Sequence, residues 1–191
     1  MPKQRITKDM VVSAAFDLAR AGGMEVVNVK AIAAALGCSV QPIYSYCDSM
    51  EGLRREVEAR TRDFIRRFTA DRVDRGDLLR STGRAYAALA REEPNLYKIF
   101  MLQQRRGISS LADLYAAEAD PRVAGAVARE LGISPDRARQ LHLHMLIYNI
   151  GIGAIFAVTD PGIPAQELFA QQEQAYSAFL KNALEGNEHE I

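Results

Sequence analysis

The stretch that decides the fold is VKAIAAALGCSVQPIYSY, residues 29–46. It combines a short amphipathic helix carrying Ile32 and Leu36 on its apolar side, a turn at Gly37, and a second short helix over 40–46. Glycine supplies the left-handed backbone conformation that a tight turn between helices requires. The pattern predicts a helix-turn-helix, whose second helix projects its first side chains outward.

Helical signals also dominate the rest of the chain, and the β-branched run at 26–29 is too short to predict a strand. Thr7, Asn28 and Ser49 are suited to begin helices as N-caps. Further helices are expected over 78–90, from Pro94 to a break at Gly107, over 111–131 with an interruption at Asp120-Pro121, over 135–159 and over 164–184. The sequence therefore predicts an all-α protein of about nine helices. Its expected parts are a three-helix helix-turn-helix domain over 1–48, a connecting helix over 49–76 and a larger helical domain over 77–191.

Composition and charge exclude several classes of protein. The 191 residues are 48% hydrophobic and 25% charged, with 24 Lys plus Arg against 24 Asp plus Glu, so a strongly basic whole-protein field is excluded. Cys38 and Cys47 form no metal-binding pattern and are expected to be reduced thiols. The N-terminus resembles no secretory signal, and the most apolar stretch, 145–158, is shorter than the roughly 20 residues that cross a bilayer. A cytoplasmic protein is expected.

The outward side chains at the start of the second helix are candidates for reading DNA. A helix of this kind fits a major groove about 12 Å wide, and a glutamine such as Gln41 can offer a bidentate edge to adenine. Hydroxyls at Tyr44 and Tyr46 could contact backbone phosphates. The candidates from this helix and the turn before it are Ser39, Val40, Gln41, Pro42, Tyr44, Ser45 and Tyr46.

Basic residues outside the second helix could add contacts. Lys30, in the first turn of the preceding helix, could reach a base or a phosphate, and the arm containing Lys3, Arg5 and Lys8 could lie along the DNA backbone. The pattern alone leaves another interpretation open, because a helix–glycine–helix arrangement also occurs in helical enzymes. In that case the two tyrosines would cap a small core.

A longer match resembles the N-terminal domain of the TetR (tetracycline-repressor-like) family of transcriptional regulators. It extends over about 50 ordered positions, about a quarter of the chain. The resembling residues are 14–18 (AAFDL), Gly22-Gly23, 29–37 (VKAIAAALG), Ser39, 43–46 (IYSY) and Leu53. The resemblance implies a homodimeric DNA-binding regulator whose divergent C-terminal domain binds a small effector. It assigns base contacts to Lys30, Ser39, Gln41 and Pro42, and phosphate contacts to Tyr44 and Tyr46.

Three positions depart from the family pattern. An aromatic or aliphatic residue usually stands where Cys47 is, and a lysine that touches phosphate usually stands where Met50 is. Asp48 adds a negative charge beside this expected backbone contact. One lost phosphate contact would flatten the salt dependence of binding by about one unit of slope.

The last two long helices are expected to form the dimer, because family members pair through them. The helix over 135–159 has two apolar stripes, one containing Ile147 and Ile150 and the other Met145 and Ile152, so it should be buried on two sides. Gly151 and Gly153 each lower helix propensity by about 1 kcal/mol relative to alanine, which favours close approach of another backbone. The alternative is a monomer in which this helix is simply buried.

An effector pocket is expected among the helices of the second half. The few charges on their apolar stripes favour an apolar or amphipathic effector, although residues of these types, taken singly, more often fill the core than contact a ligand. His142 and His144 cannot share a helix face, so neither a metal site nor a cofactor is predicted. The candidate lining residues are Tyr86, Leu89, Phe100, Met101, Tyr115, His142, Met145 and Asn149.

The sequence holds no GxGxxG, Walker A, HExxH or GxSxG motif, and an enzyme is not expected. The predicted function is a ligand-responsive transcriptional regulator, specifically a repressor. It would bind a pseudo-palindromic operator as a homodimer and be released by a small effector. The alternative is a helical small-molecule-binding or interaction protein that has lost specific DNA binding, for which Asp48 and Met50 are the best support.

Overall fold

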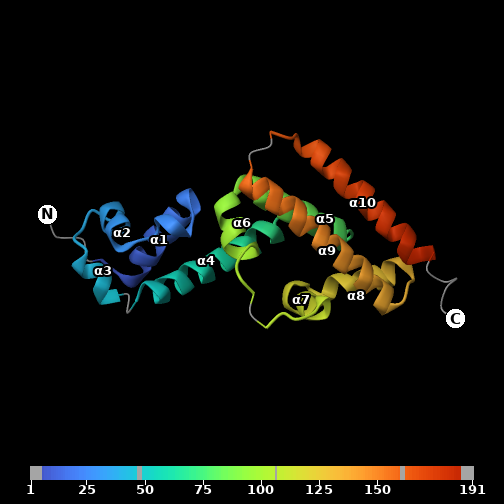
Figure 1. The fold of residues 1–191 in the computed structure, drawn as a ribbon, viewed down its shortest axis with the longest axis horizontal. Helices are drawn as coiled ribbons and strands as arrows, with labels where there is room; N and C mark the ends of the chain where they lie inside the picture. The colour runs from blue at the N-terminus through green and yellow to red at the C-terminus, as the bar shows by residue number, and fades with distance from the viewer. Residues whose placement is uncertain (1–5, 47–48, 106, 160–161, 186–191) are drawn as a thin grey trace. The chain divides into compact units, whose positions relative to one another are not determined.

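The computed structural model describes residues 6–46, 49–105, 107–159 and 162–185. Over these residues the chain forms ten α-helices and one 3-10 helix, and no strand (Figure 1). The all-α class and the predicted helix-turn-helix are confirmed. The chain divides into two compact units, the first comprising Met1–Arg67 and Glu92–Gln103 and the second comprising Phe68–Arg91 and Gln104–Ile191. The functional division at 48 and 76 stays a prediction.

The first unit is built from short helices that begin where the sequence predicts. Thr7 caps the first of them by accepting a hydrogen bond from the Met10 N–H, and Asn28 caps the third element by accepting from Ala31. Ser49 Oγ accepts from the Gly52 N–H at the start of the long fourth helix. The elements are α1 (Lys8–Gly22), the 3-10 helix η1 (Met24–Val26), α2 (Val29–Ala35), α3 (Gln41–Tyr46) and α4 (Met50–Ala70).

One apolar core holds these helices together. Ile32 of α2, Ile43 of α3 and Val57 of α4 are each fully buried, and they pack in one cluster with the valines and alanines of α1. Burying side chains of this size contributes roughly 1.5–3 kcal/mol each. The core therefore fixes α3 against α1 and α2 through a single buried isoleucine.

Helix α6 (Pro94–Met101) also belongs to the first unit, although it follows α5 in the sequence. The Arg20 guanidinium of α1 donates to both carboxylate oxygens of Glu93, one of them at 2.8 Å. The Asn95 side chain donates to the Arg20 carbonyl at 3.0 Å. These contacts join the end of α1 to the start of α6.

The second unit contains most of α5 (Leu78–Glu92), together with α7 (Leu111–Glu118), α8 (Pro121–Leu131), α9 (Pro135–Val158) and α10 (Ala165–Glu185). Helices α8 and α10 both pack along α9 (Figure 1). Leu79, Val127, Leu141 and Met145 form the buried centre of one core. Ser134 caps α9 and Pro135 occupies its first turn, as the sequence predicts.

The segment 111–131 forms two separate helices rather than one interrupted helix. Ala119 and Asp120 have extended backbones between α7 and α8, and the Asp120 carboxylate accepts a hydrogen bond from the Arg122 N–H. Proline disfavours helical geometry in the residue before it, so a helix cannot run through Asp120 into Pro121. Because this segment forms two helices, the described residues contain ten α-helices instead of the expected nine or so.

Helix α9 has the extent that the sequence predicts for 135–159, but its apolar run extends beyond the stretch 145–158. It spans 24 residues and, by length and composition alone, is long and apolar enough to cross a membrane. The stretch 145–158 alone is too short, but apolar positions such as Leu141 and Leu143 extend the run toward the N-terminus. Core helices of soluble proteins pass the same criterion.

A buried polar junction joins three helices of the second unit. The Gln172 amide nitrogen of α10 donates to Asn149 Oδ1 of α9 at 2.8 Å and to the Gly83 carbonyl of α5 at 3.3 Å. A Cβ on Gly83 would come within 2.5 Å of Asn149 Nδ2, so glycine permits the close approach of α5 and α9. The Oε1 atom of Gln172 is buried and accepts no hydrogen bond from the residues that the structure describes.

Candidate nucleic-acid interface and effector region

The turn between α2 and α3 is built by a helix-ending motif. Gly37 has φ of 63°, which is the left-handed conformation that the sequence predicts for it. Its N–H donates to the Ala34 carbonyl at 3.2 Å, and the Cys38 N–H donates to Ala33 at 3.0 Å. These two bonds satisfy carbonyls at the end of α2 and turn the chain toward α3.

Helix α3 presents most of its predicted reading residues to solvent. Ile43 is fully buried and anchors the helix, whereas Tyr44 is 66% exposed and Val40 is 40% exposed. Gln41 is exposed, and its side-chain amide makes no hydrogen bond with the described residues. The helix therefore has an apolar side in the core and a polar side that is free to bind another molecule.

Other predicted contacts of this region differ in their exposure. Ser39 and Ser45 are exposed, but the Ser45 hydroxyl donates to the Gln41 carbonyl of its own helix at 3.3 Å. Pro42 is half-buried. Tyr46 is half-buried and packs against the core, so part of its ring fills space.

The basic residues around α3 differ in whether their charge is already paired with a carboxylate. Lys30 is exposed at the start of α2 and forms no ion pair with any residue that the structure describes. Lys8, by contrast, is bound to Glu56 of α4 at 2.6 Å. Met50 is half-buried and packs against the core of the first unit. Four residues named above, Lys3, Arg5, Cys47 and Asp48, lie outside the described residues.

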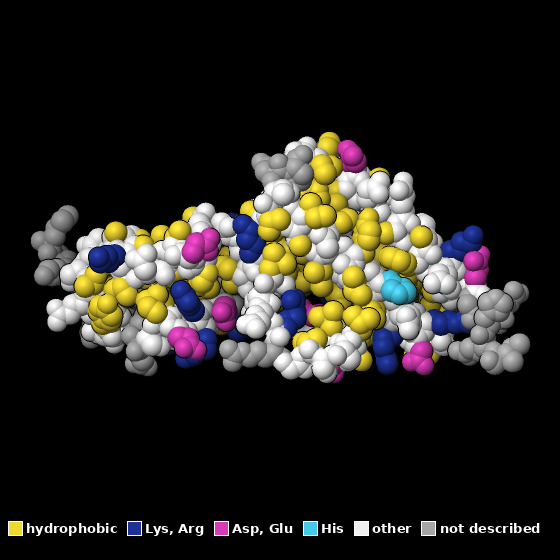
Figure 2. Space-filling view, viewed as in Figure 1, with side chains coloured by type: hydrophobic (Ala, Val, Ile, Leu, Met, Phe, Trp, Pro, Cys, Tyr) yellow, Lys and Arg dark blue, Asp and Glu magenta, His cyan; other side chains and the backbone are white. Residues whose placement is uncertain are grey.

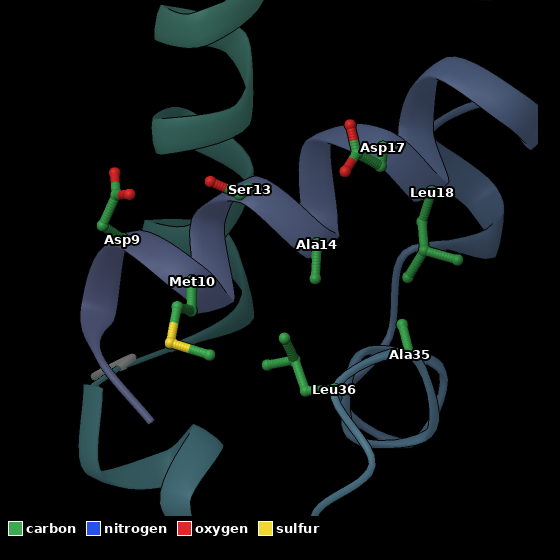
Figure 3. A pocket seen from close by; sticks show the side chains of 8 residues that line it. All are labelled: Asp9, Met10, Ser13, Ala14, Asp17, Leu18, Ala35 and Leu36. Carbon is green, nitrogen blue, oxygen red and sulfur yellow. The ribbon is translucent and has the colours of Figure 1, made fainter. Parts of the chain in front are cut away.

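A shallow hollow of about 440 Å³ lies between α1 and α2 (Figure 3). Met10, Leu18 and Leu36 form its apolar part, and Asp9 and Asp17 lie on its α1 side. Carboxylates repel phosphates, so this hollow is a poor site for a DNA backbone. None of the predicted effector residues lines it.

In the second unit, Tyr115 of α7 and His142 of α9 meet directly. The Tyr115 hydroxyl and His142 Nδ1 share a hydrogen bond of 2.8 Å, and the two rings meet edge to face at 5.3 Å. His142 is 6% exposed, and burial lowers the pKa of its imidazole to about 4, although Asp120 opposes this shift. The imidazole is therefore neutral at physiological pH.

The remaining predicted effector residues do not form one group. Burial raises the pKa of the Tyr86 hydroxyl, with smaller contributions from the carboxylates Glu118 and Asp120. Met145 lies in the core of the second unit, and Asn149 is bound to Gln172. Leu89 is fully buried, and Phe100 and Met101 belong to α6 in the first unit. Their role in binding an effector stays a prediction.

His142 and His144 contact different neighbours. His142 reaches α7, whereas the His144 ring lies 5.0 Å from that of Phe179 in α10. In the part of the chain that the structure describes, no three His, Cys, Asp or Glu side chains are grouped so that they could hold a metal ion.

One side of α9 is apolar, and the described part of the chain leaves it uncovered. Ile147, Ile155 and Val158 are 43%, 56% and 64% exposed, and Gly151 lies between them in the sequence with open space where a Cβ would be. These four residues, spaced three or four apart, form one stripe, the α9 stripe. Figure 2 shows hydrophobic side chains gathered over this part of the second unit. On α10, Tyr176, Phe179 and Leu180 pack instead against the core of their own unit.

The contacts between residues distant in the sequence have no local signal that would predict them. Arg20 and Glu93 are 73 positions apart, and nothing in the local pattern pairs them. Gln172 was also missed, although its spacing from Leu168 and Tyr176 places it on the apolar side of α10 and could have marked it as a buried polar residue.

Residues 11–57 match the family model described as bacterial regulatory proteins, tetR family. The resemblance found in the sequence is thereby confirmed for the N-terminal domain. Comparison with curated proteins gives no match. Among solved structures, a transcriptional regulator from Rhodococcus sp. Rha1 is similar, with 15% identity and a TM-score of 0.60. The similarity covers 93% of this chain and 97% of that one, so the two share a fold along nearly their whole length.

Proposed function

Residues 11–57 form a helix-turn-helix domain of the tetR type, and from this premise we propose that the protein is a transcriptional regulator that binds DNA as a homodimer. The observation that carries the proposal is the division of α3 between a buried Ile43 and an exposed side containing Gln41 and Tyr44. A helix anchored in this way can enter a major groove without unfolding its own core.

The proposed contacts follow from these exposures. Gln41 reads a base edge, with adenine as its usual match, and Ser39, Val40 and Pro42 border it. The Tyr44 hydroxyl binds a backbone phosphate, and Lys30 adds a positive charge from α2. Two copies of α3 would read half-sites about 34–36 Å apart, which gives a pseudo-palindromic operator.

The α9 stripe supports the homodimer. Exposed apolar side chains that form one continuous stripe favour a protein interface. A second copy of the same stripe would bury it about a two-fold axis, and Gly151 would allow two backbones to approach closely. The α9 stripe could instead lie against a membrane. Recovery of the protein in the soluble fraction without detergent would argue against a membrane and support a cytoplasmic location.

We further propose that a small apolar or amphipathic effector binds the second unit and releases the protein from its operator, so that it acts as a repressor. Two features could carry the change to the helix-turn-helix. Helix α4 contributes residues to both units, and α6 is bound to α1 through Arg20 and Glu93. An effector would act by favouring a conformation that no longer fits both half-sites.

Selection of bound duplexes from a random-sequence library tests the DNA-binding proposal. The expected result is an enriched site with two-fold symmetry and half-sites one helical turn apart. Failure to enrich any sequence, with a folded dimer present, would favour the alternative of a helical ligand-binding or interaction protein. An enzyme would instead convert a bound compound, and mass analysis of the compound after incubation would show this.

A further inference from the structure

We propose that Arg54, on the second turn of α4, binds a DNA phosphate and takes the role of the lysine that is missing at position 50. This inference rests on the proposed function. It assigns a backbone contact to a residue outside the helix-turn-helix itself. The charges, the geometry of α4 and the absence of a partner for Arg54 among the described residues each support it.

Among the residues that the structure describes, the carboxylates around the start of α4 are bound to cations other than Arg54. Arg55 binds Glu51 at 3.0 Å, and Lys8 binds Glu56 at 2.6 Å. Arg60 is bound to Asp9 and Ser13. Arg54 is exposed and has no ion pair or hydrogen bond through its guanidinium with the residues that the structure describes. Its guanidinium is therefore free to bind an anion.

The geometry of the helix directs Arg54 toward the start of α4. It stands four residues after Met50, so the two side chains lie on nearly the same side of the helix. Side chains in a helix tilt toward its N-terminus, and an arginine there extends over the preceding turn. Glu58 lies one turn further on, and no ion pair forms between it and Arg54 within the described residues.

Helix α4 also brings Arg54 close to α3 along the chain. Only residues 47–49 separate Tyr46 from Met50, and both of these residues pack against the same core. The α1 side of α4 is the one that carries Glu56, and helical spacing places Arg54 about 160° away from Glu56. Arg54 is thus not covered by α1. A bidentate guanidinium suits a phosphate better than an ammonium does.

Arg62 provides a matched control. It is an exposed arginine on the same helix, it has no partner among the described residues, and it lies eight positions, or about 12 Å, further along α4. The experiment measures binding of a duplex selected by the wild-type protein, over a range of salt concentrations. It compares Arg54→Ala, Arg62→Ala and the double variant Met50→Lys/Arg54→Ala. Thermal melting verifies that each variant is folded.

The expected result for Arg54→Ala is a logarithmic salt slope reduced by about 0.9 per protomer, or nearly two units for a dimer. Binding to the selected and to mixed-sequence duplexes should weaken by a similar factor. Arg62→Ala should keep the wild-type slope, and Met50→Lys should restore the slope lost in Arg54→Ala. A wild-type slope in Arg54→Ala, or an equal reduction in Arg62→Ala, would overturn the assignment. If the wild-type protein selects no duplex, the proposed function itself fails.

Discussion

The hydroxyl of Tyr115 and the imidazole of His142 are joined by a 2.8 Å hydrogen bond between α7 and α9. Helix α7 has no residue in the buried class, and this bond joins it to α9. The ion pair between Arg105 and Glu118, at 2.5 Å, adds a contact at the C-terminal end of α7. Two polar contacts therefore help to hold α7 in its position.

We predict that His142 makes folding stability depend on pH. The pKa of His142 is about 4 in the folded protein and 6.5 in an unfolded chain, so the unfolded state binds more protons between these values. The full stability is present above pH 6.5, and about 3 kcal/mol is lost as the pH falls toward 4. Urea unfolding at several pH values would measure this. His142→Gln should remove this part of the pH dependence, whereas His144→Gln should keep it.

We expect Gly83→Ala to destabilise the protein by about 1–3 kcal/mol, because the added methyl group would collide with the Asn149 amide. Helix propensity alone would favour alanine by about 1 kcal/mol. Gly125→Ala in α8 is the control, since its Cβ would make an ordinary 3.6 Å contact with Arg129. Chemical denaturation should give opposite signs for the two variants. Equal stabilisation in both would show that the junction at Asn149 is loosely packed.

Gly151→Trp should produce a folded monomer. A side chain at this position meets only open space within its own chain, but it would separate two α9 helices that pack at the α9 stripe. Sedimentation velocity at several concentrations would detect the change in mass. Ala112→Trp, on the exposed side of α7, should leave the dimer intact. A dimeric Gly151→Trp variant would mean that the α9 stripe is not the interface.

Gln41→Ala should reduce sequence discrimination and leave non-specific binding unchanged. Loss of a bidentate contact with one base costs about 1–3 kcal/mol on the matched operator. Competition between the selected duplex and mixed-sequence DNA would measure this difference. Arg62→Ala is the control, because Arg62 lies on α4 and is not among the predicted DNA contacts. An equal loss on both duplexes after Gln41→Ala would contradict base reading by this side chain.

The local features of the fold were predictable from the sequence because they depend on neighbouring residues. The caps at Thr7, Asn28 and Ser134 each bond an N–H three residues later, and Gly37 takes the left-handed conformation of the turn. The exposed side of α3 follows in the same way from the burial of Ile43.

Features that join distant segments were not predictable from one sequence. The placement of α6 with α1 depends on Glu93, 73 residues after its partner Arg20. The junction of Gly83, Asn149 and Gln172 requires α5, α9 and α10 to be aligned along their axes so that these residues meet. Helical periodicity gives the side of a helix but not this alignment. For the same reason, the residues expected to line one effector pocket are divided between the two units.

The α9 stripe has a consequence for how gene control would scale with expression level. On the proposed dimer, each operator-bound complex consumes two chains, so below the dissociation constant of the dimer operator occupancy rises with the square of cellular abundance. A given change in synthesis would then change the occupancy of the regulated promoter more steeply than it would for a monomeric regulator. A variant with a polar α9 stripe would lose this steepness, even with an unaltered α3.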